Sequence, residues 1–354
     1  MAEGANHQMN AADDDRSPSA GIPAKILDAY HGRTILITGG RGYIGSALAK
    51  ALAEVNCKLI LLDQSPGEAW KPAGQVAEVL VLNGDVSLRE TWEKVLPGVN
   101  HVFHLAAKEY FYRSEYDPER DYQVNALPIL RLLEVCRVQN YRPKIVFASS
   151  ANLFGLVDTL PVNEDSRDNP LTTWAVHKLT AEHYLHLYAQ QFGLKATTLR
   201  LSNVYGPTVR RSVMNRVVIN KVIAQALDGE ALVTYANQSC IRDFVFLQDV
   251  VQAFLLAGAC CGSTRSPVYV VGSGEGKTIA DVWRLIADSV RSHIVRDVPI
   301  RLDASVEIEP LEQRSFVADT GRFRDATGWK PQTGLTQGID ITVRALLIES
   351  GRYI

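Results

Sequence analysis

Short apolar runs alternate with longer segments of helical periodicity over the first two thirds of the chain. The runs are rich in Val, Ile and Leu without polar alternation, which is typical of strands buried on both faces of a parallel sheet. Parallel strands need crossover connections, and the helical segments supply them. The pattern therefore predicts an α/β fold with a doubly wound parallel sheet. The predicted strands are 33–38, 58–63, 79–83, 101–106, 144–149 and 197–201, and the longer predicted helices are 43–55, 119–139 and 172–191.

The alternation becomes irregular after the last of these strands, which divides the chain. Roughly residues 30–200 are predicted to form the doubly wound domain, and the residues that follow a smaller second domain. Residues 1–25 are rich in Ala, Asp, Ser and Gly. Such a segment buries too little apolar surface to offset its ordering entropy, so we expect a flexible tail.

The charge of the chain is nearly balanced. Its 354 residues include 37 Lys and Arg against 39 Asp and Glu, a formal net charge of −2. A nearly neutral chain lacks the excess of positive charge that binding to nucleic acid or an anionic membrane favours. The sequence also shows no signal peptide and no apolar run of the roughly 18 residues that a membrane span needs. The five cysteines form no C-x-x-C pair, so we expect reduced thiols and no metal site. We predict a soluble, cytoplasmic protein without nucleic-acid or membrane partners.

Three glycines, Gly39, Gly42 and Gly45, stand where the first predicted strand meets the first predicted helix. Glycine permits a tight turn and lets the main chain approach a pyrophosphate, while the helix N-terminus offers N–H groups to the anion. A glycine triplet alone also fits a turn needed only for packing. Its place between a buried strand and a helix favours a dinucleotide-binding turn.

Acidic residues follow the next two predicted strands. Asp63 ends the second strand, where a carboxylate binds the ribose hydroxyls of a dinucleotide. The residues directly after it include no arginine to receive a 2′-phosphate, which favours NAD over NADP. Asp85 and Val86 follow the third strand, at a position suited to the adenine ring.

With these features the chain resembles the extended short-chain dehydrogenase/reductase superfamily, in its NAD-dependent nucleotide-sugar epimerase/dehydratase branch. The landmarks lie at residues 38–45, 63, 84–86, 104–107, 149–155, 178–182, 200–207, 242–244 and 328–331. The resemblance implies NAD as the cofactor and a nucleotide-sugar substrate. It also implies a Rossmann-type domain formed by residues 30–205 and 243–262, and a smaller C-terminal substrate-binding domain formed by residues 206–242 and 268–354. The residues that it implies for cofactor binding are Gly39, Gly42, Tyr43, Ile44, Gly45, Asp63, Asp85, Val86, Leu105, Ala106, Ala107 and Lys178.

The resemblance also implies a reaction in which NAD takes a hydride from a sugar carbon while a tyrosinate removes the hydroxyl proton. That tyrosine precedes a lysine by one helical turn, and a serine at a strand end binds the reacting hydroxyl. Ser150 and Lys178 match the serine and the lysine, but Trp174 stands at the tyrosine position. An indole donates one N–H and cannot gain and lose a proton near neutral pH, whereas general acid–base catalysis requires this.

Three explanations of Trp174 remain open. Another group can move the proton: His177 titrates near neutrality, although a lone histidine beside a helix face is more often structural. Glu109, Tyr110 and Tyr112, which follow the fourth predicted strand, are further candidates. Alternatively the protein is a catalytically silent NAD-binding protein, or a reaction takes place for which Ser150 and Lys178 suffice, including dehydration or reduction of a nucleotide sugar. We favour an active epimerase.

The remaining expectations concern substrate and assembly. By resemblance, Asn203, Arg242 and Arg314 contact the substrate diphosphate, which suits the planar fork of a guanidinium. Ser150 followed by Ala151 resembles the 4-epimerases rather than the 4,6-dehydratases, while Phe154, Pro128 and Leu201-Ser202 depart from the family pattern. The predicted helices 119–139 and 172–191 resemble those of a four-helix dimer interface, so we expect a homodimer.

Overall fold

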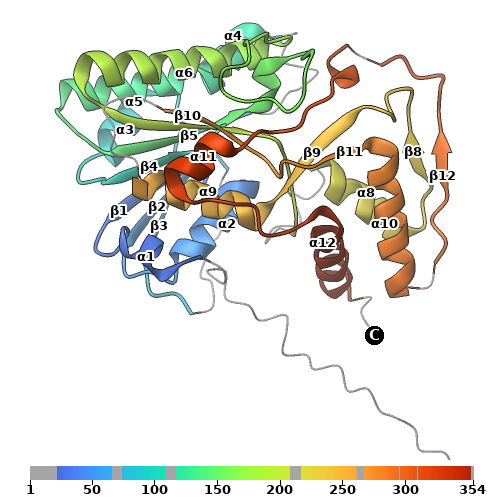
Figure 1. The fold of residues 1–354 in the computed structure, drawn as a ribbon. Coiled ribbons are helices and arrows are strands. Elements are labelled where there is room, and N and C mark those ends of the chain that lie inside the picture. Colours follow the sequence, from blue (N-terminus) through green and yellow to red (C-terminus); the bar gives the residue numbers. More distant parts are fainter. Residues whose placement is uncertain are drawn as a thin grey trace, which may run out of the picture.

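A computed structural model describes residues 22–65, 74–108, 117–207, 217–260, 267–294, 296–308 and 310–351. Its centre is a seven-stranded sheet in which all neighbouring strands are parallel, in the order β10-β6-β5-β4-β1-β2-β3 (Figure 1). This confirms the predicted doubly wound sheet. The strands are β1 Thr34–Thr38, β2 Lys58–Asp63, β3 Glu78–Asn83, β4 His101–His104, β5 Lys144–Ser150, β6 Lys195–Leu201 and β10 Val268–Val271.

The strand order reverses at β1, which pairs with β2 on one side and with β4 on the other. Thr38, the last residue of β1, is opposite Leu62 of β2 and His104 of β4. The carboxyl ends of these strands therefore meet at one edge of the sheet. In open parallel sheets, ligands bind outside this edge at the point where the order reverses.

Helices cover both faces of the sheet (Figure 1). One face packs against α1 Ala24–Asp28, α2 Tyr43–Leu52, α9 Leu247–Cys260 and α11 Gly321–Thr327, and its core includes Ile37, Leu48, Phe103 and Phe254. The other face packs against α3 Arg89–Val95, α5 Leu127–Val138 and α6 Thr173–Phe192, and its core includes Leu36, Trp92, Leu132 and Phe147. The strands are thus buried on both sides, as their unbroken apolar runs predicted.

The single helix predicted over residues 119–139 is wrong, because two helices occupy this stretch. α4 spans Pro118–Asn125 and α5 begins at Leu127, with Ala126 between them. Pro128 lies in the first turn of α5 and has no N–H to donate to the preceding turn, which ends one helix and starts the next. Asp117 caps α4 by accepting a hydrogen bond from the Arg120 N–H at 2.9 Å.

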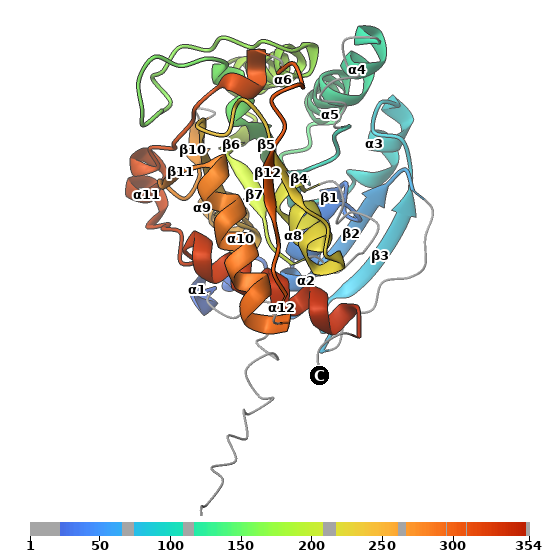
Figure 2. The same ribbon diagram turned by 90° about the vertical axis from the view of Figure 1, so that its right-hand side faces the viewer.

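A second group of elements follows β6 and packs around its own core (Figure 2). It contains a three-stranded sheet in the order β11-β9-β7 and a pair of strands β12-β8. Tyr205, Phe244, Phe246, Ile219 and Trp283 are among its core residues. The elements are β7 Asn203–Tyr205, α8 Val218–Asp228, β8 Leu232–Thr234, β9 Ile241–Phe246, β11 Gly276–Thr278, α10 Ile279–Ile294, β12 Ile300–Leu302 and α12 Leu335–Glu349.

Two of the predicted domain boundaries separate or divide strands that belong to one sheet. The boundary at residue 268 separates β10 from the seven-stranded sheet that it joins, and the boundary at residue 243 cuts through β9. The division into two domains therefore stays a prediction, with β10 better grouped with the large sheet. Among the helices that the structure describes, none is long and apolar enough to cross a bilayer.

Candidate active site

The glycine turn lies at the carboxyl end of β1 and leads directly into α2. Gly39 has a positive φ of 66°, and a Cβ there would lie 2.8 Å from the main-chain nitrogen of Ala106. A Cβ on Gly45 would meet the carbonyl oxygen of Gly39 even more closely. Neither position accepts a larger residue without movement of the main chain, so the turn presents bare backbone at the edge where ligands bind.

The segment after β4 is held against this turn by a hydrogen-bonded side chain. The Thr38 hydroxyl oxygen lies 2.8 Å from His104 Nδ1 and accepts the Ala106 N–H at 3.2 Å. Leu105 and Ala106 are half-buried, and Ala107 is exposed. The structure therefore brings these predicted cofactor residues against Gly39, although they are far from it in sequence.

Asp63 ends β2 beside the turn. Its carboxylate accepts the Arg41 N–H at 3.2 Å and the Ser65 N–H at 3.0 Å. The Arg41 guanidinium donates to the Ser65 carbonyl at 2.7 Å, so a positive charge lies close to Asp63. The sequence analysis considered only the residues after Asp63 and missed this arginine, which comes from the turn itself.

The other predicted cofactor residues lie around the same edge. Asp85 accepts the Ser87 N–H at 2.8 Å, and the buried Val86 packs in the same core cluster as Ala106. Ile44 packs beneath the turn. The Tyr43 hydroxyl donates to the Gly206 carbonyl at 2.9 Å, and burial raises the pKa of this phenol well above its usual range. Tyr43 thus links the turn to the second group of elements.

This arrangement fits a dinucleotide. Bare backbone faces the N-terminus of α2, where N–H groups and the helix dipole favour a pyrophosphate. The partly exposed Asp63 carboxylate beside the turn suits ribose hydroxyls.

Ser150 ends β5, and Lys178 binds the main chain of the same strand two residues earlier. The Ser150 hydroxyl oxygen accepts the Asn152 N–H at 3.1 Å and retains its own proton to donate. The buried Lys178 donates from Nζ to the Ala148 carbonyl at 2.8 Å, and its Nζ lies 4.6 Å from the centre of the Phe147 ring. The main chain of β5 therefore sets the position of this amine next to Ser150.

Trp174 lies one helical turn before Lys178 on α6. Its ring centre is 5.8 Å from Lys178 Nζ, and the indole packs in a small apolar cluster with Leu153 and Leu179. Only 8% of the residue is exposed, and its Nε1–H is buried with no hydrogen-bond partner in the described structure. The indole fills the space beside Lys178, and its N–H cannot be lost and regained near neutral pH.

His177 belongs to a different contact, between α6 and α4. Its Nδ1 lies 2.6 Å from Oδ1 of the buried Asp121, and the ring of Tyr122 meets the imidazole edge-on at 5.6 Å. These contacts give His177 a role in helix packing. The three other predicted alternatives lie outside the described residues: Glu109, Tyr110 and Tyr112.

The residues predicted for the diphosphate lie close to one another but are engaged in internal contacts. The Asn203 amide donates to the Asp243 carbonyl at 2.9 Å. The buried Arg242 donates to the carbonyl oxygens of Glu312, at 2.7 Å, and of Arg314. Arg242 therefore fixes the segment that carries Arg314, which is half-buried.

The sequence analysis missed a buried ionic cluster behind Ser150, formed by Arg200, Glu182, Asp168 and Ser149. It also missed Asn125, whose Oδ1 accepts the Lys108 N–H at 3.3 Å at the end of the β4 segment. The partners are between 17 and 33 residues apart, so no local motif connects them. Only the positions of Ser149, Glu182 and Arg200 within the family landmarks offered a signal.

Comparison with known proteins identifies the family. Residues 35–272 match the model of the NAD dependent epimerase/dehydratase family. The chain belongs to this family. It is 30% identical over 316 residues to a UDP-glucose 4-epimerase of Mycolicibacterium smegmatis, covering 87% of this chain and 96% of the relative. A UDP-glucose 4-epimerase of Thermotoga maritima solved with UDP-glucose has a TM-score of 0.79 at 27% identity, with 90% of this chain and 99% of that chain covered.

A UDP-glucose 4-epimerase of Thermus thermophilus solved with NAD is 30% identical, with a TM-score of 0.73, and covers 88% of this chain and 98% of that chain. Together these matches confirm the predicted family, the predicted NAD-dependent enzyme class and NAD as the cofactor. The roles of individual site residues stay predictions.

The close approach at the turn gives a first test. We expect Gly45→Ala to weaken NAD binding at least about tenfold, because a displacement of about 1 Å at a site can cost about a hundredfold. Binding is measured by titration of the cofactor-free protein with NAD. The control is Gly334→Ala, at a glycine where an added Cβ meets nothing within 4 Å. Equal NAD affinity in both variants would contradict the tight-turn argument.

The histidine behind the turn predicts a dependence of stability on pH. Burial, together with the positive charge of Lys178, lowers the pKa of His104 to about 3. Below the ordinary pKa of about 6.5, the unfolded chain binds a proton that the folded protein does not, so stability falls as the pH falls from there toward 3. Between pH 7 and pH 5, His104 accounts for a loss of up to about 2 kcal/mol.

His104→Gln removes this loss, and urea unfolding at the two pH values measures it. The absolute stability of the variant also changes, because His104 stacks on Phe147, so only the difference between the pH values is compared. Substitution of the exposed His31 by Gln serves as the control. The explanation is wrong if His104→Gln loses as much stability as the wild type.

Proposed function

We propose that the protein interconverts UDP-hexoses or UDP-hexuronates that differ in configuration at C4. The named relatives support this substrate class: besides the UDP-glucose 4-epimerases, a UDP-glucuronate 4-epimerase of Arabidopsis thaliana is 28% identical over 88% of this chain. The observation that carries the proposal is the position of Lys178, whose Nζ binds the main chain of β5 two residues before Ser150. Both polar groups thus lie at the strand edge that also bears the glycine turn.

The reaction needs a hydride and a proton to leave the C4 carbinol and return. When bound, NAD would supply the hydride chemistry of this site, accepting the C4 hydride and returning it. In the reactive state Lys178 is an uncharged amine: Ser150 hydrogen-bonds the C4 oxygen, takes its proton and passes its own proton to this amine, and the transfers reverse on return. In this scheme Trp174 moves no proton, and the acid–base work falls to Ser150 and Lys178.

A second candidate is a silent NAD-binding protein of the same fold. The buried and unpartnered N–H of Trp174 favours it, because nothing at this position can act as the usual base. Incubation of the purified protein with NAD and single UDP-hexoses and UDP-hexuronates, followed by NMR of the sugar, separates the two. A new C4 epimer supports the epimerase, whereas an unchanged panel with NAD bound supports the silent protein.

Substitutions of Lys178, Trp174 and His177 test which of these side chains takes part in the proton transfer. We expect Lys178→Met to lower kcat by about a hundredfold or more, since positioned acid–base groups contribute about 10²–10⁴. Trp174→Phe keeps the apolar packing and removes only the N–H, so kcat stays within about threefold, as it does for His177→Gln. The assay is epimer formation at saturating UDP-sugar. A large loss in His177→Gln with an active Lys178→Met would instead make the histidine the base.

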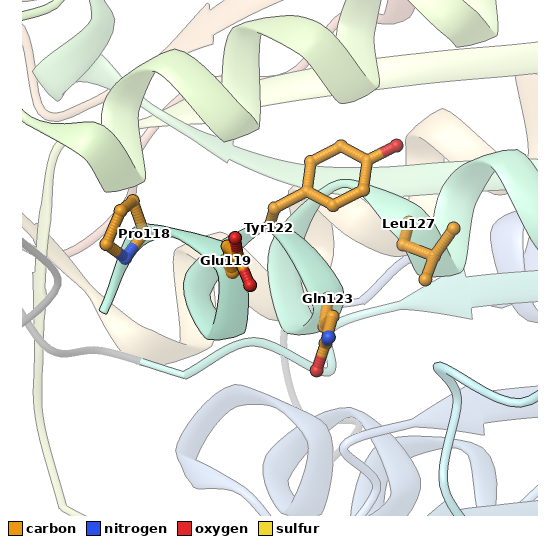
Figure 3. Close-up of a pocket in the computed structure, with 5 residues that line it drawn as sticks. All are labelled: Pro118, Glu119, Tyr122, Gln123 and Leu127. Atoms are coloured by element: carbon orange, nitrogen blue, oxygen red, sulfur yellow. The ribbon is translucent and has the colours of Figure 1, made fainter.

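We also propose that the protein is a homodimer in which the α4 and α6 side meets a second copy; a cytoplasmic location likewise stays a prediction. α4 bears an open hollow of about 440 Å³ lined by Pro118, Glu119, Tyr122, Gln123 and Leu127 (Figure 3). The adjacent α6 exposes 44% of Val176 and 41% of Leu187. Apolar side chains on neighbouring helices gain from burial against a second copy.

Light scattering tests the dimer. At micromolar concentration the wild type is expected at twice the 39.0 kDa of one chain, and Leu187→Glu at the single mass, because a charge on the buried face is costly. Leu302→Glu, at a residue of β12 that is 54% exposed, stays dimeric and serves as the control. A wild type of 39.0 kDa would refute the dimer.

A further inference from the structure

A buried ionic cluster connects three segments behind the reaction site; we call Arg200, Glu182, Asp168 and Ser149 the Arg200 cluster. The Arg200 guanidinium donates from Nη2 to Glu182 Oε2 at 2.7 Å and from Nε to both Glu182 oxygens at 3.2 Å. It also donates from Nη1 and Nη2 to the two oxygens of Asp168, at 2.6 and 3.1 Å. One planar fork thus holds two carboxylates, each by at least two hydrogen bonds.

Two members of the Arg200 cluster, Ser149 and Glu182, are adjacent to residues of the reaction site, and Arg200 connects them. The Ser149 hydroxyl donates to Glu182 Oε1 at 2.5 Å, and the next residue along β5 is Ser150. Glu182 lies one helical turn after Lys178, so both side chains project from the same side of α6. Arg200 is paired with Ser149 in the sheet register.

The cluster also reaches the segments on either side of the site. The Arg200 guanidinium lies 4.9 Å from the centre of the Phe154 ring, in the short 3-10 helix Ala151–Phe154 that Ser150 caps. Asp168 stands in the loop before α6, four residues before Thr172, which caps the helix by accepting the Ala175 N–H. The strand end, the 3-10 helix and the start of α6 therefore converge on one guanidinium.

Burial makes these contacts sensitive to substitution. The side chains of Arg200 and Glu182 are 6% and 5% exposed, and that of Asp168 is 30% exposed. Burial alone would lower the pKa of Arg200, but the bonds to Glu182 and Asp168 outweigh it and raise the pKa. Only a guanidinium holds both carboxylates in this way, because an ammonium is a point charge without a fork.

We propose that Arg200 is a positioning residue for the reaction: by holding Glu182 and Asp168, it fixes the end of β5 against α6 and so sets Ser150 relative to Lys178. This rests on the proposed epimerase, in which Ser150 and Lys178 act on the C4 hydroxyl together. Arg200 itself touches neither substrate nor cofactor in this scheme. Its role is to set the distance between the Ser150 hydroxyl and the Lys178 amine, which exchange a proton in this scheme.

The test uses Arg200→Lys, which keeps the charge and removes the fork. We expect kcat to fall by about tenfold to a hundredfold, while KM for the UDP-sugar and the affinity for NAD change less than about twofold. Asp168→Asn, at the most exposed member of the cluster, gives a smaller fall of the same kind and serves if Arg200→Lys does not fold. The matched control is Arg137→Lys, because Arg137 binds both oxygens of Glu134 on the exposed side of α5.

Amide hydrogen exchange provides a readout that does not depend on turnover. The Asn152 N–H is bonded to Ser150 and the Ala175 N–H to Thr172, so these amides report the strand end and the start of α6. In Arg200→Lys we expect faster exchange in peptides covering residues 149–155 and 172–178, and no change in Arg137→Lys. A structural role alone would instead lower the Tm and leave kcat unchanged in the folded variant.

The outcomes separate the two proposals. If the wild type forms epimers, a fall in kcat together with faster exchange supports the positioning role, and either result without the other overturns it. If the wild type binds NAD but turns over no UDP-sugar, the proposed function fails. In that case faster exchange in Arg200→Lys still supports the role of the cluster in holding Ser150 against α6, and unchanged exchange overturns it.

Discussion

The contact on which the site depends is the approach of two stretches of bare main chain at the carboxyl ends of β1 and β4. At Gly39 a single added carbon would lie 2.8 Å from the nitrogen of Ala106, and Gly45 closes on Gly39 from the other side. Because Thr38 ties the same segment to His104, the turn and the end of β4 form one rigid edge. Asp63, which accepts the Arg41 N–H of the turn, is positioned by the same edge.

Lys178 is held in place by contacts that do not involve position 174, where the sequence predicts that Trp174 stands for the family's tyrosine. Lys178 Nζ binds the Ala148 carbonyl and lies over the Phe147 ring, both on β5, while the indole packs beside it. A side chain at position 174 is thus not required to hold the amine. This separates two functions that a tyrosine would combine, filling the space before Lys178 and exchanging the proton.

The sheet, the glycine turn and Asp63 could be predicted from sequence because they depend on local periodicity and on a short spacing. The break at Ala126 was also readable, since Pro128 cannot continue a helix. The internal contacts of Arg242 could not be predicted: its guanidinium binds the main chain at Glu312 and Arg314, and its role at the diphosphate stays a prediction. The direction of a long side chain is decided by segments about seventy residues away.

The side-chain contact between the glycine turn and the second group of elements could not be predicted from the sequence either. Tyr43 follows the glycine turn, and its family position predicted a cofactor contact, yet its hydroxyl donates to Gly206. The Asn220 side chain of α8 donates to that same carbonyl at 2.7 Å and accepts the Gly206 N–H at 3.3 Å. The cofactor turn and the first helix of the second group are therefore joined through one peptide group. The positions of the glycine turn and of α8 are thus coupled through Gly206, so a shift of one element is transmitted to the other.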